Sequence, residues 1–409
     1  MRRSLARALL LGVPIGAVLL AAGAYLAVAL TRRPPPLAFR AAQLPSKFPG
    51  GRLRMTWPAG GEAAVDVEGI GPLDPSGAQH PVPIASVAKI MTALVIVRDH
   101  PLSAGAQGAE IPITQTDVST YRADRALGES VVRVTDGETL SERQALEALL
   151  LPSANNVATV LADWDAGSEA AFVAKMNARA QALGLTATRY ADASGFDPGT
   201  VSTARDQARL AMLTLARPIL AQIVAMPQAR LPVAGLVHNL DALLGQDGIV
   251  GMKTGSTTAA GACFVFASRR LVGGRRVMVV GAVLGQPLTR DAPTVLDGAF
   301  AATTRLLRGL SHGLETLGLL AHRRPVGWIT APWGRRVAVR TAAPRAFVGW
   351  PGLPVEVRLR QVDHPRAPLH AGQEVGQLVI RAAEERLRLP LVVSSGLSTP
   401  SLEWRITHP

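Results

Sequence analysis

The stretch "PIASVAKIMTALVIV", residues 83–97, decides the fold of the main part of the chain. Apolar side chains recur in it with the 3.6-residue period of a helix, at Ile84, Val87, Ile90, Met91, Leu94 and Val95. Pro83 precedes this stripe, where proline marks a helix start. The pattern predicts a helix over residues 84–98, on which Ser86 and Lys89 share one face.

Lysine at position 89 is unusual in this chain. Among 43 basic side chains of lysine and arginine, the lysines are only Lys47, Lys89, Lys175 and Lys253. A buried lysine can release its proton and then act as a base toward a serine hydroxyl, whereas arginine stays charged. Ser86 and Lys89 are therefore candidates for a nucleophile and its base. A helix cap beside a surface lysine explains the pair as well.

A second polar group lies in "LLLPSANNVATVLA", residues 149–162. Ser153 and Asn155 stand one residue apart in a tight connection between two helical runs, so both side chains can point into one cleft. There Ser153 could relay protons and Asn155 could hold a substrate amide. The alternative is a polar helix–helix turn in which Ser153 is the N-cap.

The third group lies in "DGIVGMKTGSTTAAG", residues 247–261. A strand that carries Lys253 and Thr254 and then Gly255 lets its edge approach a ligand closely, because glycine has no side chain. The N–H of Ser256 could then join that of Ser86 in an oxyanion hole. A charged edge strand with a turn is the alternative. The three groups together predict a serine nucleophile site.

The rest of the body mixes helices with strands. Helices are predicted at 84–98, 139–151, 168–184, 202–216 and 292–310, and strands at 63–71, 261–270 and 275–285. After about residue 315, short β-like runs alternate with Pro, Gly and Asp. We therefore predict an α+β domain over residues 53–314 and an all-β domain over residues 315–409.

The N-terminal residues resemble a targeting segment. Residues 8–30 carry no charge and lie between three arginines before them and two after them. As a helix they span about 35 Å, enough to cross a bilayer. We expect residues 1–38 to be an N-terminal membrane anchor, with a cleaved signal and secretion as the alternative, and residues 39–52 to be an exposed linker. The charge asymmetry predicts a single-pass protein whose body lies outside the cytoplasm.

Composition narrows the class of partner. The net charge is +13 and apolar residues make up 48% of the chain. A basic surface suits a polyanionic wall or membrane, but only 4% of residues are aromatic and no nucleic-acid-binding motif is present, so we expect no nucleic acid. The single cysteine, Cys263, lies in an apolar run and is predicted to be a core residue. The scattered histidines predict no metal site.

The three groups make the chain resemble penicillin-binding proteins and serine β-lactamases, which carry Ser-x-x-Lys, Ser-x-Asn and Lys-Thr-Gly motifs in this order. The resemblance is closest to the serine-type D-alanyl-D-alanine carboxypeptidases, the low-molecular-mass penicillin-binding proteins. "SGFDPGTVSTARDQARLA" (194–211) and "APLHAGQEVGQLVI" (367–380) also look like segments of that family. The resemblance covers residues 50–400. It implies an antiparallel sheet with helices, then a small all-β domain, and no cofactor.

The resemblance also implies a reaction. Ser86 would attack the carbonyl of the penultimate D-alanine of a peptidoglycan stem peptide, with Lys89 as general base. Ser153, supported by Lys253, would pass the proton to the departing D-alanine. Water would then hydrolyse the acyl-enzyme, and the activity would serve cell-wall remodelling and cell shape.

The binding roles follow from the same resemblance. Asn155 would contact the acyl side of the substrate, and Lys253 and Thr254 would receive its terminal carboxylate beside Gly255. The N–H groups of Ser86 and Ser256 would hold the oxyanion. Penicillins would acylate the serine and leave slowly. The membrane contact is expected through residues 8–30.

The sequence departs from the family's pattern in three places. Ala154 stands where glycine is usual. The C-terminal "STPSLEWRITHP" is too short and proline-broken for the amphipathic helix that many members use for membrane attachment. Residues 115–135 hold more arginine and acid than expected, so the rim of the cleft could differ.

Two other functions stay open. A β-lactamase needs a deacylating base, and between the second and third motifs only Glu169 is available, on a predicted helix. A catalytically silent wall-binding scaffold is the other, although the intact Ser86 and Lys89 argue against it. Within the enzyme class, an endopeptidase or transpeptidase would use the same acyl-enzyme.

Overall fold

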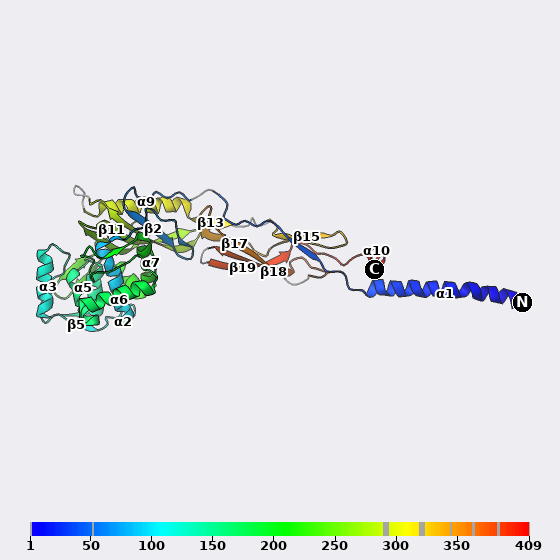
Figure 1. Cartoon of the computed structure of the whole chain (residues 1–409), viewed down its shortest axis with the longest axis horizontal. Helices are drawn as coiled ribbons and strands as arrows, with labels where there is room; N and C mark the ends of the chain where they lie inside the picture. The colour runs from blue at the N-terminus through cyan, green and yellow to red at the C-terminus, as the bar shows by residue number, and fades with distance from the viewer. Residues whose placement is uncertain are drawn as a thin grey trace. The chain divides into compact units, whose positions relative to one another are not determined.

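The computed structural model describes residues 2–50, 53–288, 294–318, 324–343, 346–361, 365–382 and 385–408, with side chains from residue 16 onward in the first helix. The chain forms two compact units (Figure 1). The larger unit comprises Gly51–Thr316 and Val348–Trp350, and the smaller comprises Met1–Gly50, Leu317–Phe347 and Pro351–Pro409. The larger is α+β and the smaller is rich in strands, which confirms the predicted fold class for both.

A five-stranded antiparallel sheet forms the centre of the larger unit. Its order is β10 (Ile249–Thr257), β11 (Gly261–Val272), β12 (Arg275–Gln286), β2 (Glu62–Val67) and β3 (Gly71–Pro72). The predicted hairpin between β11 and β12 turns at Gly273 and Gly274, both with positive φ, which only glycine adopts readily. Because β10 lies at the edge of this sheet, one side of the 253–256 segment is not covered by a neighbouring strand.

The two faces of the sheet bury different side chains, because neighbours along a strand point in opposite directions. Cys263 and Val265 of β11 join the main hydrophobic core. Phe264 points the other way and packs edge-on against Phe300 of α9 (Asp297–Gly313), with ring centroids 5.3 Å apart. Figure 1 shows α9 along one side of the strands. The fully buried Cys263 is a core residue, as predicted.

Helices on the other side of the sheet share one hydrophobic core with it. Of these, α7 (Ala204–Leu215) and α8 (Pro218–Val224) contact its strands. The remaining helices pack onto one another and onto these two: α2 (Lys89–Asp99), α4 (Glu142–Leu150), α5 (Asn155–Ala166) and α6 (Glu169–Ala182). The helix predicted over 84–98 begins as a 3-10 turn, η1 (Ala85–Ala88), which continues into α2. Every residue of α2 from Lys89 to Val97 is buried, so this helix runs through the core.

Local capping sets several helix starts. Ser141 and Gln144 form the predicted capping box of α4. A further helix, α3 (Gln115–Ala126), was not predicted, although Thr114 and Asp117 form the same kind of capping box at its start. Short pairs complete the unit: β4 (Val82–Pro83) with β7 (Val201–Ser202), β5 (Glu110–Pro112) with β6 (Thr139–Ser141), β8 (Gln228–Leu231) with β9 (Gly235–His238), and a 3-10 turn, η2 (Gln246–Gly248).

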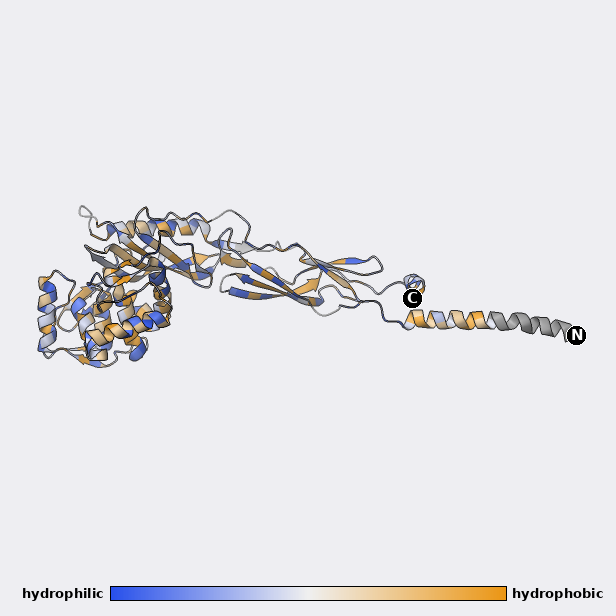
Figure 2. Ribbon diagram, viewed as in Figure 1, coloured by the Kyte–Doolittle hydropathy of each residue, from blue (hydrophilic) through white to orange (hydrophobic). Residues whose placement is uncertain are grey.

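The smaller unit contains a six-stranded sheet. Its order is β1 (Ala38–Ala41), β14 (Gly327–Thr330), β15 (Arg336–Thr341), β19 (Glu385–Val393), β18 (Glu374–Ala382) and β17 (Glu356–Gln361). β13 (Glu315–Gly318) pairs with β16 (Ala346–Gly349) in a separate two-stranded sheet. Hydrophilic and hydrophobic residues alternate along β17 to β19 (Figure 2), as expected for strands with one buried face.

Most of the described residues 39–50 of the expected exposed linker 39–52 are exposed or half-buried, but the segment is docked on the β-rich unit at two points. Phe39 lies in β1, opposite Ile329 of β14. Phe48 is fully buried, and its ring lies 5.7 Å from that of Phe347. The proline and arginine content of the segment suggested a tether, but its two phenylalanines bury apolar surface, which stabilises docking on the β-rich unit.

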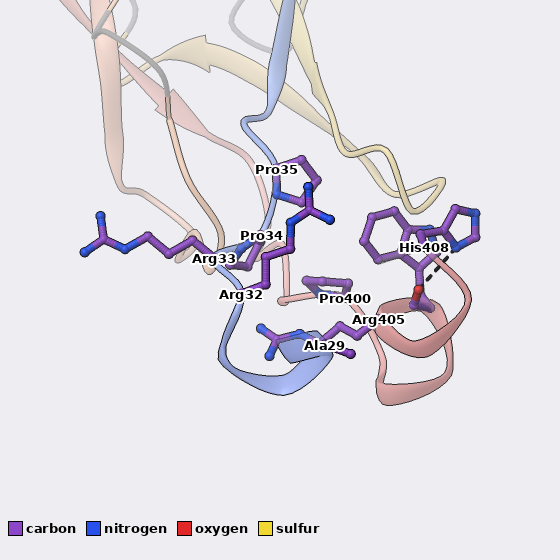
Figure 3. A pocket seen from close by; sticks show the side chains of 9 residues that line it. Ala29, Arg32, Arg33, Pro34, Pro35, Pro400, Arg405 and His408 are labelled. Carbon is purple, nitrogen blue, oxygen red and sulfur yellow. Dashed lines mark hydrogen bonds between the residues drawn. The ribbon is translucent and has the colours of Figure 1, made fainter. Parts of the chain in front are cut away.

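The N-terminal helix α1 (Arg2–Thr31) contacts the short C-terminal helix α10 (Leu402–Thr407). Arg405 donates a hydrogen bond to the carbonyl oxygen of Leu30. A cavity of about 230 Å³ lies between the two ends (Figure 3) and is lined by Ala29, Arg32, Arg33, Pro34, Pro35, Pro400, Trp404, Arg405 and His408.

The side chains of residues 8–15, part of the predicted membrane span 8–30, lie outside those that the structure describes. The described part of α1 is mostly hydrophobic (Figure 2). Among the described residues, no helix combines the length and the apolar character that crossing a bilayer requires.

Candidate active site

Ser86 and Lys89 lie at the junction of η1 and α2. Lys89 Nζ is 2.9 Å from Ser86 Oγ. Ala85, just before the serine, has a φ of +48°, a conformation that is uncommon for a residue with a side chain and that often occurs at functional sites. The predicted pair is therefore in direct contact, inside the larger unit.

The Lys89 amine is surrounded by protein. Its side chain is fully buried, and this burial lowers the pKa of Lys89 to about 7. Besides Ser86, its Nζ contacts Asn155 Oδ1 at 2.5 Å and the Ser194 carbonyl oxygen at 2.8 Å. A neutral amine has two N–H groups for these two acceptors and one lone pair, which would face the serine hydroxyl. An ammonium, with three N–H groups, fits the same three contacts, so the lowered pKa of Lys89, and not the geometry, makes the uncharged form available near neutral pH.

Nearby carboxylates limit this loss of basicity. Asp192, Glu129 and Asp124 each act to raise the pKa of Lys89 and so oppose the larger effect of burial. Burial and the charge of Glu129 raise the pKa of Asp124 to about 6. The sequence analysis gave none of these three acids a role. Asp124 lies on the missed helix α3, and its capping box was the available signal.

Ser153 and Asn155 differ in how they connect to the pair. Asn155, the first residue of α5, holds Lys89 through Oδ1 and donates from Nδ2 to Glu129, so it positions the lysine. Ser153 is buried with a φ of +68°, and its Oγ has no hydrogen-bond partner among the described residues. Ala154, not Ser153, is the N-cap of α5.

The segment 192–200 forms one wall of the site. Asp192 organises it by accepting hydrogen bonds from Ser194 Oγ, from the N–H of Phe196 and from Thr200 Oγ1. Gly195 has a φ of +83°, and a Cβ built on it would lie 1.9 Å from the Ala85 carbonyl oxygen. Only glycine allows this loop to approach the turn that carries the serine.

The third predicted group lies on β10, next to the same turn. A Cβ built on Gly255 would lie 2.9 Å from the Ser86 nitrogen, so the strand backbone passes close to Ser86. Lys253 and Thr254 are buried, and Ser256 is half-buried. Burial, with the nearby Lys89, keeps the pKa of Lys253 well below its ordinary value. Lys253 Nζ donates to the Thr254 carbonyl oxygen at 3.0 Å.

Asp241 is a further buried acid that the sequence analysis missed. Its charge acts to raise the pKa of Lys253, and burial raises the pKa of Asp241 itself to about 6. Its Oδ1 accepts from the N–H of Leu243, whereas its Oδ2 is buried without a partner among the described residues. Its neighbour Leu240 donates to the carbonyl oxygen of Leu151. The sequence around Asp241 indicates only a turn. It gives no sign that the Asp241 carboxylate lies near Lys253, because that proximity depends on the tertiary fold.

Comparisons with known proteins found a matching family and similar sequences. The model of the family described as D-alanyl-D-alanine carboxypeptidase, Peptidase S11, matches residues 73–287. The D-alanyl-D-alanine carboxypeptidase DacB2 of Mycobacterium tuberculosis is 38% identical over 231 residues, which cover 54% of this chain and 74% of the relative. A D-alanyl-D-alanine endopeptidase of Pseudomonas aeruginosa is 36% identical over 192 residues, covering 45% of this chain and 58% of that protein.

A solved structure is similar in fold to both units. The D-alanyl-D-alanine carboxypeptidase DacD of Francisella tularensis superimposes with a TM-score of 0.58. The match covers 88% of this chain and 98% of that one at 23% identity, so it concerns the fold alone. That fold is an α+β domain followed by a β-rich domain.

Proposed function

The chain belongs to the D-alanyl-D-alanine carboxypeptidase family, and on this premise we propose that it removes the terminal D-alanine from peptidoglycan stem peptides through an acyl-enzyme on Ser86. The observation that carries the proposal is the position of Lys89 Nζ, 2.9 Å from Ser86 Oγ. Its other two contacts are acceptors that a neutral amine satisfies. Ser86 is thus the nucleophile and Lys89 its base.

The first chemical step forms the acyl-enzyme. Ser86 Oγ bonds to the carbonyl carbon of the penultimate D-alanine while its proton moves to Lys89 Nζ. The tetrahedral intermediate then collapses, the C–N bond breaks, and the departing D-alanine amine takes up a proton. Ser153 is proposed to relay this proton, and its buried Oγ is free to do so because it has no partner among the described residues. Asn155 keeps Lys89 oriented throughout.

The negative charge that develops on the carbonyl oxygen needs hydrogen-bond donors. The N–H of Ser86 lies in the first turn of η1, where backbone N–H groups have no partner within the helix. The N–H of Ser256, next to Gly255 on β10, is the second donor in this proposal. Gly255 allows the strand and the turn to come close enough to form one oxyanion hole.

The substrate also carries a terminal carboxylate. Lys253 and Thr254 would bind it from β10, which requires a positive charge on Lys253. Burial opposes that charge, and Asp241 favours it. Asp241 is accordingly proposed as the residue that keeps Lys253 protonated. A water molecule then hydrolyses the acyl-enzyme, whereas the acyl group left by a penicillin would persist on Ser86.

The experiment uses a peptide ending in D-Ala-D-Ala and measures released D-alanine for the wild type and for Ser86→Ala. The wild type should release D-alanine, and the variant should lose release and labelling by a fluorescent penicillin. Full activity in the variant would exclude the mechanism, and an unlabelled, inactive wild type would favour the silent scaffold. Rapid hydrolysis of a chromogenic cephalosporin would favour a β-lactamase. Cleavage of cross-linked dimers alone would favour the endopeptidase activity named for the Pseudomonas relative.

We also propose that the catalytic unit works outside the cytoplasm and that residues 8–30 hold it at the membrane. The uncharged run and its flanking arginines support this, as does a substrate that lies in the cell wall. Alkaline extraction of membranes should leave the full chain in the membrane pellet and release a chain that starts at residue 37. Release of the full chain would contradict the anchor.

A further inference from the structure

Five arginines share the exposed face of three neighbouring strands in the smaller unit. β17, β18 and β19 pair antiparallel, with Arg358 opposite Val379 and Val379 opposite Arg388. In the same register, Glu356 lies opposite Arg381, which lies opposite Arg386. Residues two apart on a strand point to the same side, so this arginine face consists of Arg358, Arg360, Arg381, Arg386 and Arg388, all of them exposed.

The positive charge of the arginine face is only partly balanced. Glu356 pairs with Arg358, and its other oxygen lies 3.8 Å from Arg381. Arg360, Arg386 and Arg388 form no ion pair with a described residue. The apolar side chains on the opposite face of the sheet can be buried whichever polar residues occupy the exposed face, so packing does not explain the arginines. An arrangement of like charges on adjacent strands costs stability, which points to a ligand that neutralises them.

The spacing of the face suits a linear polyanion. Neighbouring strands lie about 4.8 Å apart, and residues two apart on a strand about 6.8 Å. The five arginine side chains therefore leave the sheet close together and can present several guanidinium groups to successive charges of a linear polymer. Guanidinium binds phosphate with paired hydrogen bonds. A hollow of about 40 Å³ lies among Glu356, Arg358, Arg360, Val379, Arg381 and Arg386. We propose that the arginine face binds a phosphate-linked polymer.

The chemistry of the surroundings favours such a polymer over a bilayer or a nucleic acid. Among the described residues of β17 to β19, no large hydrophobic side chain is exposed, so nothing is available to insert between lipids. No aromatic residue occurs between Trp350 and Trp404, so the face offers no ring for stacking on bases. A phosphate polymer without bases needs only the guanidinium groups.

The test measures binding of the full chain to end-labelled long-chain polyphosphate by fluorescence anisotropy over a range of salt concentrations. Arg358→Gln combined with Arg388→Gln should raise Kd for polyphosphate about tenfold at low salt. The expected change is modest because an ion pair between an exposed arginine and a phosphate contributes little binding free energy. The slope of log Kd against log salt should fall by about one for each arginine removed. Release of D-alanine and the melting temperature should not change.

A matched control removes the same charge elsewhere in the unit. Arg335 and Arg366 are exposed and lie outside the arginine face. Arg335→Gln combined with Arg366→Gln should leave polyphosphate binding nearly unchanged. An equal loss in both double variants, or no binding by the wild type, would overturn the proposal. It would also be overturned if vesicles containing phosphatidylglycerol, and not polyphosphate, lost affinity in the Arg358/Arg388 variant.

Discussion

Replacing Gly255 with alanine should abolish most of the catalytic activity and leave the chain folded. The added Cβ would lie 2.9 Å from the Ser86 nitrogen and 3.0 Å from the Val87 nitrogen. The first distance is about 0.6 Å shorter than the ~3.5 Å at which non-bonded heavy atoms meet. Gly255 lies in a regular strand without positive φ, so alanine adds no backbone strain of its own. Either β10 moves away from the turn or the new methyl group blocks the Ser86 N–H.

Both outcomes disturb the proposed oxyanion hole. Loss of one donor costs 10²–10³ in kcat for comparable hydrolases, and a displacement below 1 Å has a similar effect on well-positioned groups. We therefore expect kcat for D-alanine release to fall about 10²-fold, or about 2.7 kcal/mol of transition-state stabilisation. The rate at which a fluorescent penicillin acylates Ser86 should fall in parallel, because both reactions pass through the same oxyanion.

A control substitution separates this effect from loss of stability. Gly281→Ala lies in β12 of the same sheet, where the Cβ would meet the Phe266 ring at 2.4 Å and the Ala64 carbonyl oxygen at 2.7 Å. It should lower the melting temperature without changing kcat per folded molecule. If Gly255→Ala keeps kcat within about threefold of the wild type, less than 0.7 kcal/mol is lost and the assignment of the oxyanion hole is wrong.

Three further predictions follow from the same site. The proposed mechanism uses the neutral form of Lys89, whose pKa is lowered to about 7. The rate at which a fluorescent penicillin acylates Ser86 should therefore rise about tenfold per pH unit below pH 7 and level off above it. A constant rate from pH 5 to 7 would contradict this prediction. Asp241→Asn removes a charge that raises the pKa of Lys253, so less of Lys253 should be protonated. At pH 8, kcat/KM for a peptide with a free terminal carboxylate should fall about tenfold, whereas kcat/KM for the matching peptide amide should not change. Equal losses for both peptides would show that Asp241 does not act by keeping Lys253 charged. Gly195→Ala places a Cβ 1.9 Å from the Ala85 carbonyl oxygen and should cost about 3 kcal/mol in thermal unfolding, whereas an unchanged melting temperature would show that the 192–200 segment moves freely.

Local patterns predicted the long strands and most of the long helices of the larger unit, but not α3, α8 or the short strand pairs. The capping box at Ser141 and Gln144 and the Gly273–Gly274 turn depend on neighbours in sequence, and both formed as expected. The helix α3 was missed because its few apolar side chains give no clear stripe, and only Val118 is buried in it. The strand β1 was missed because four residues are too few for a periodic signal. Its assignment depends on the partner strand β14.

In the candidate site, too, some residues could be identified from local sequence and others only from tertiary contacts. The motif residues identified Ser86 and Lys89, since three positions along a helix bring two side chains together whatever the rest of the fold does. The polar atoms of Asn155 bond to Lys89 and Glu129, so it positions the lysine, and its expected contact with substrate stays a prediction. Asp241 gave no signal, because its effect on Lys253 acts through space between residues in different elements.

The sequence alone determined which residues can do the chemistry and that this chain carries the motifs of a serine acyl-transfer enzyme. Only the tertiary structure decided that the pKa of Lys89 is lowered to about 7, because that pKa depends on full burial and on acids from other parts of the chain. It also decided that Gly255 passes beside the Ser86 N–H, a contact between segments that are distant in the chain. Local propensities follow from neighbouring residues, whereas burial and through-space charge arise only when the whole unit packs.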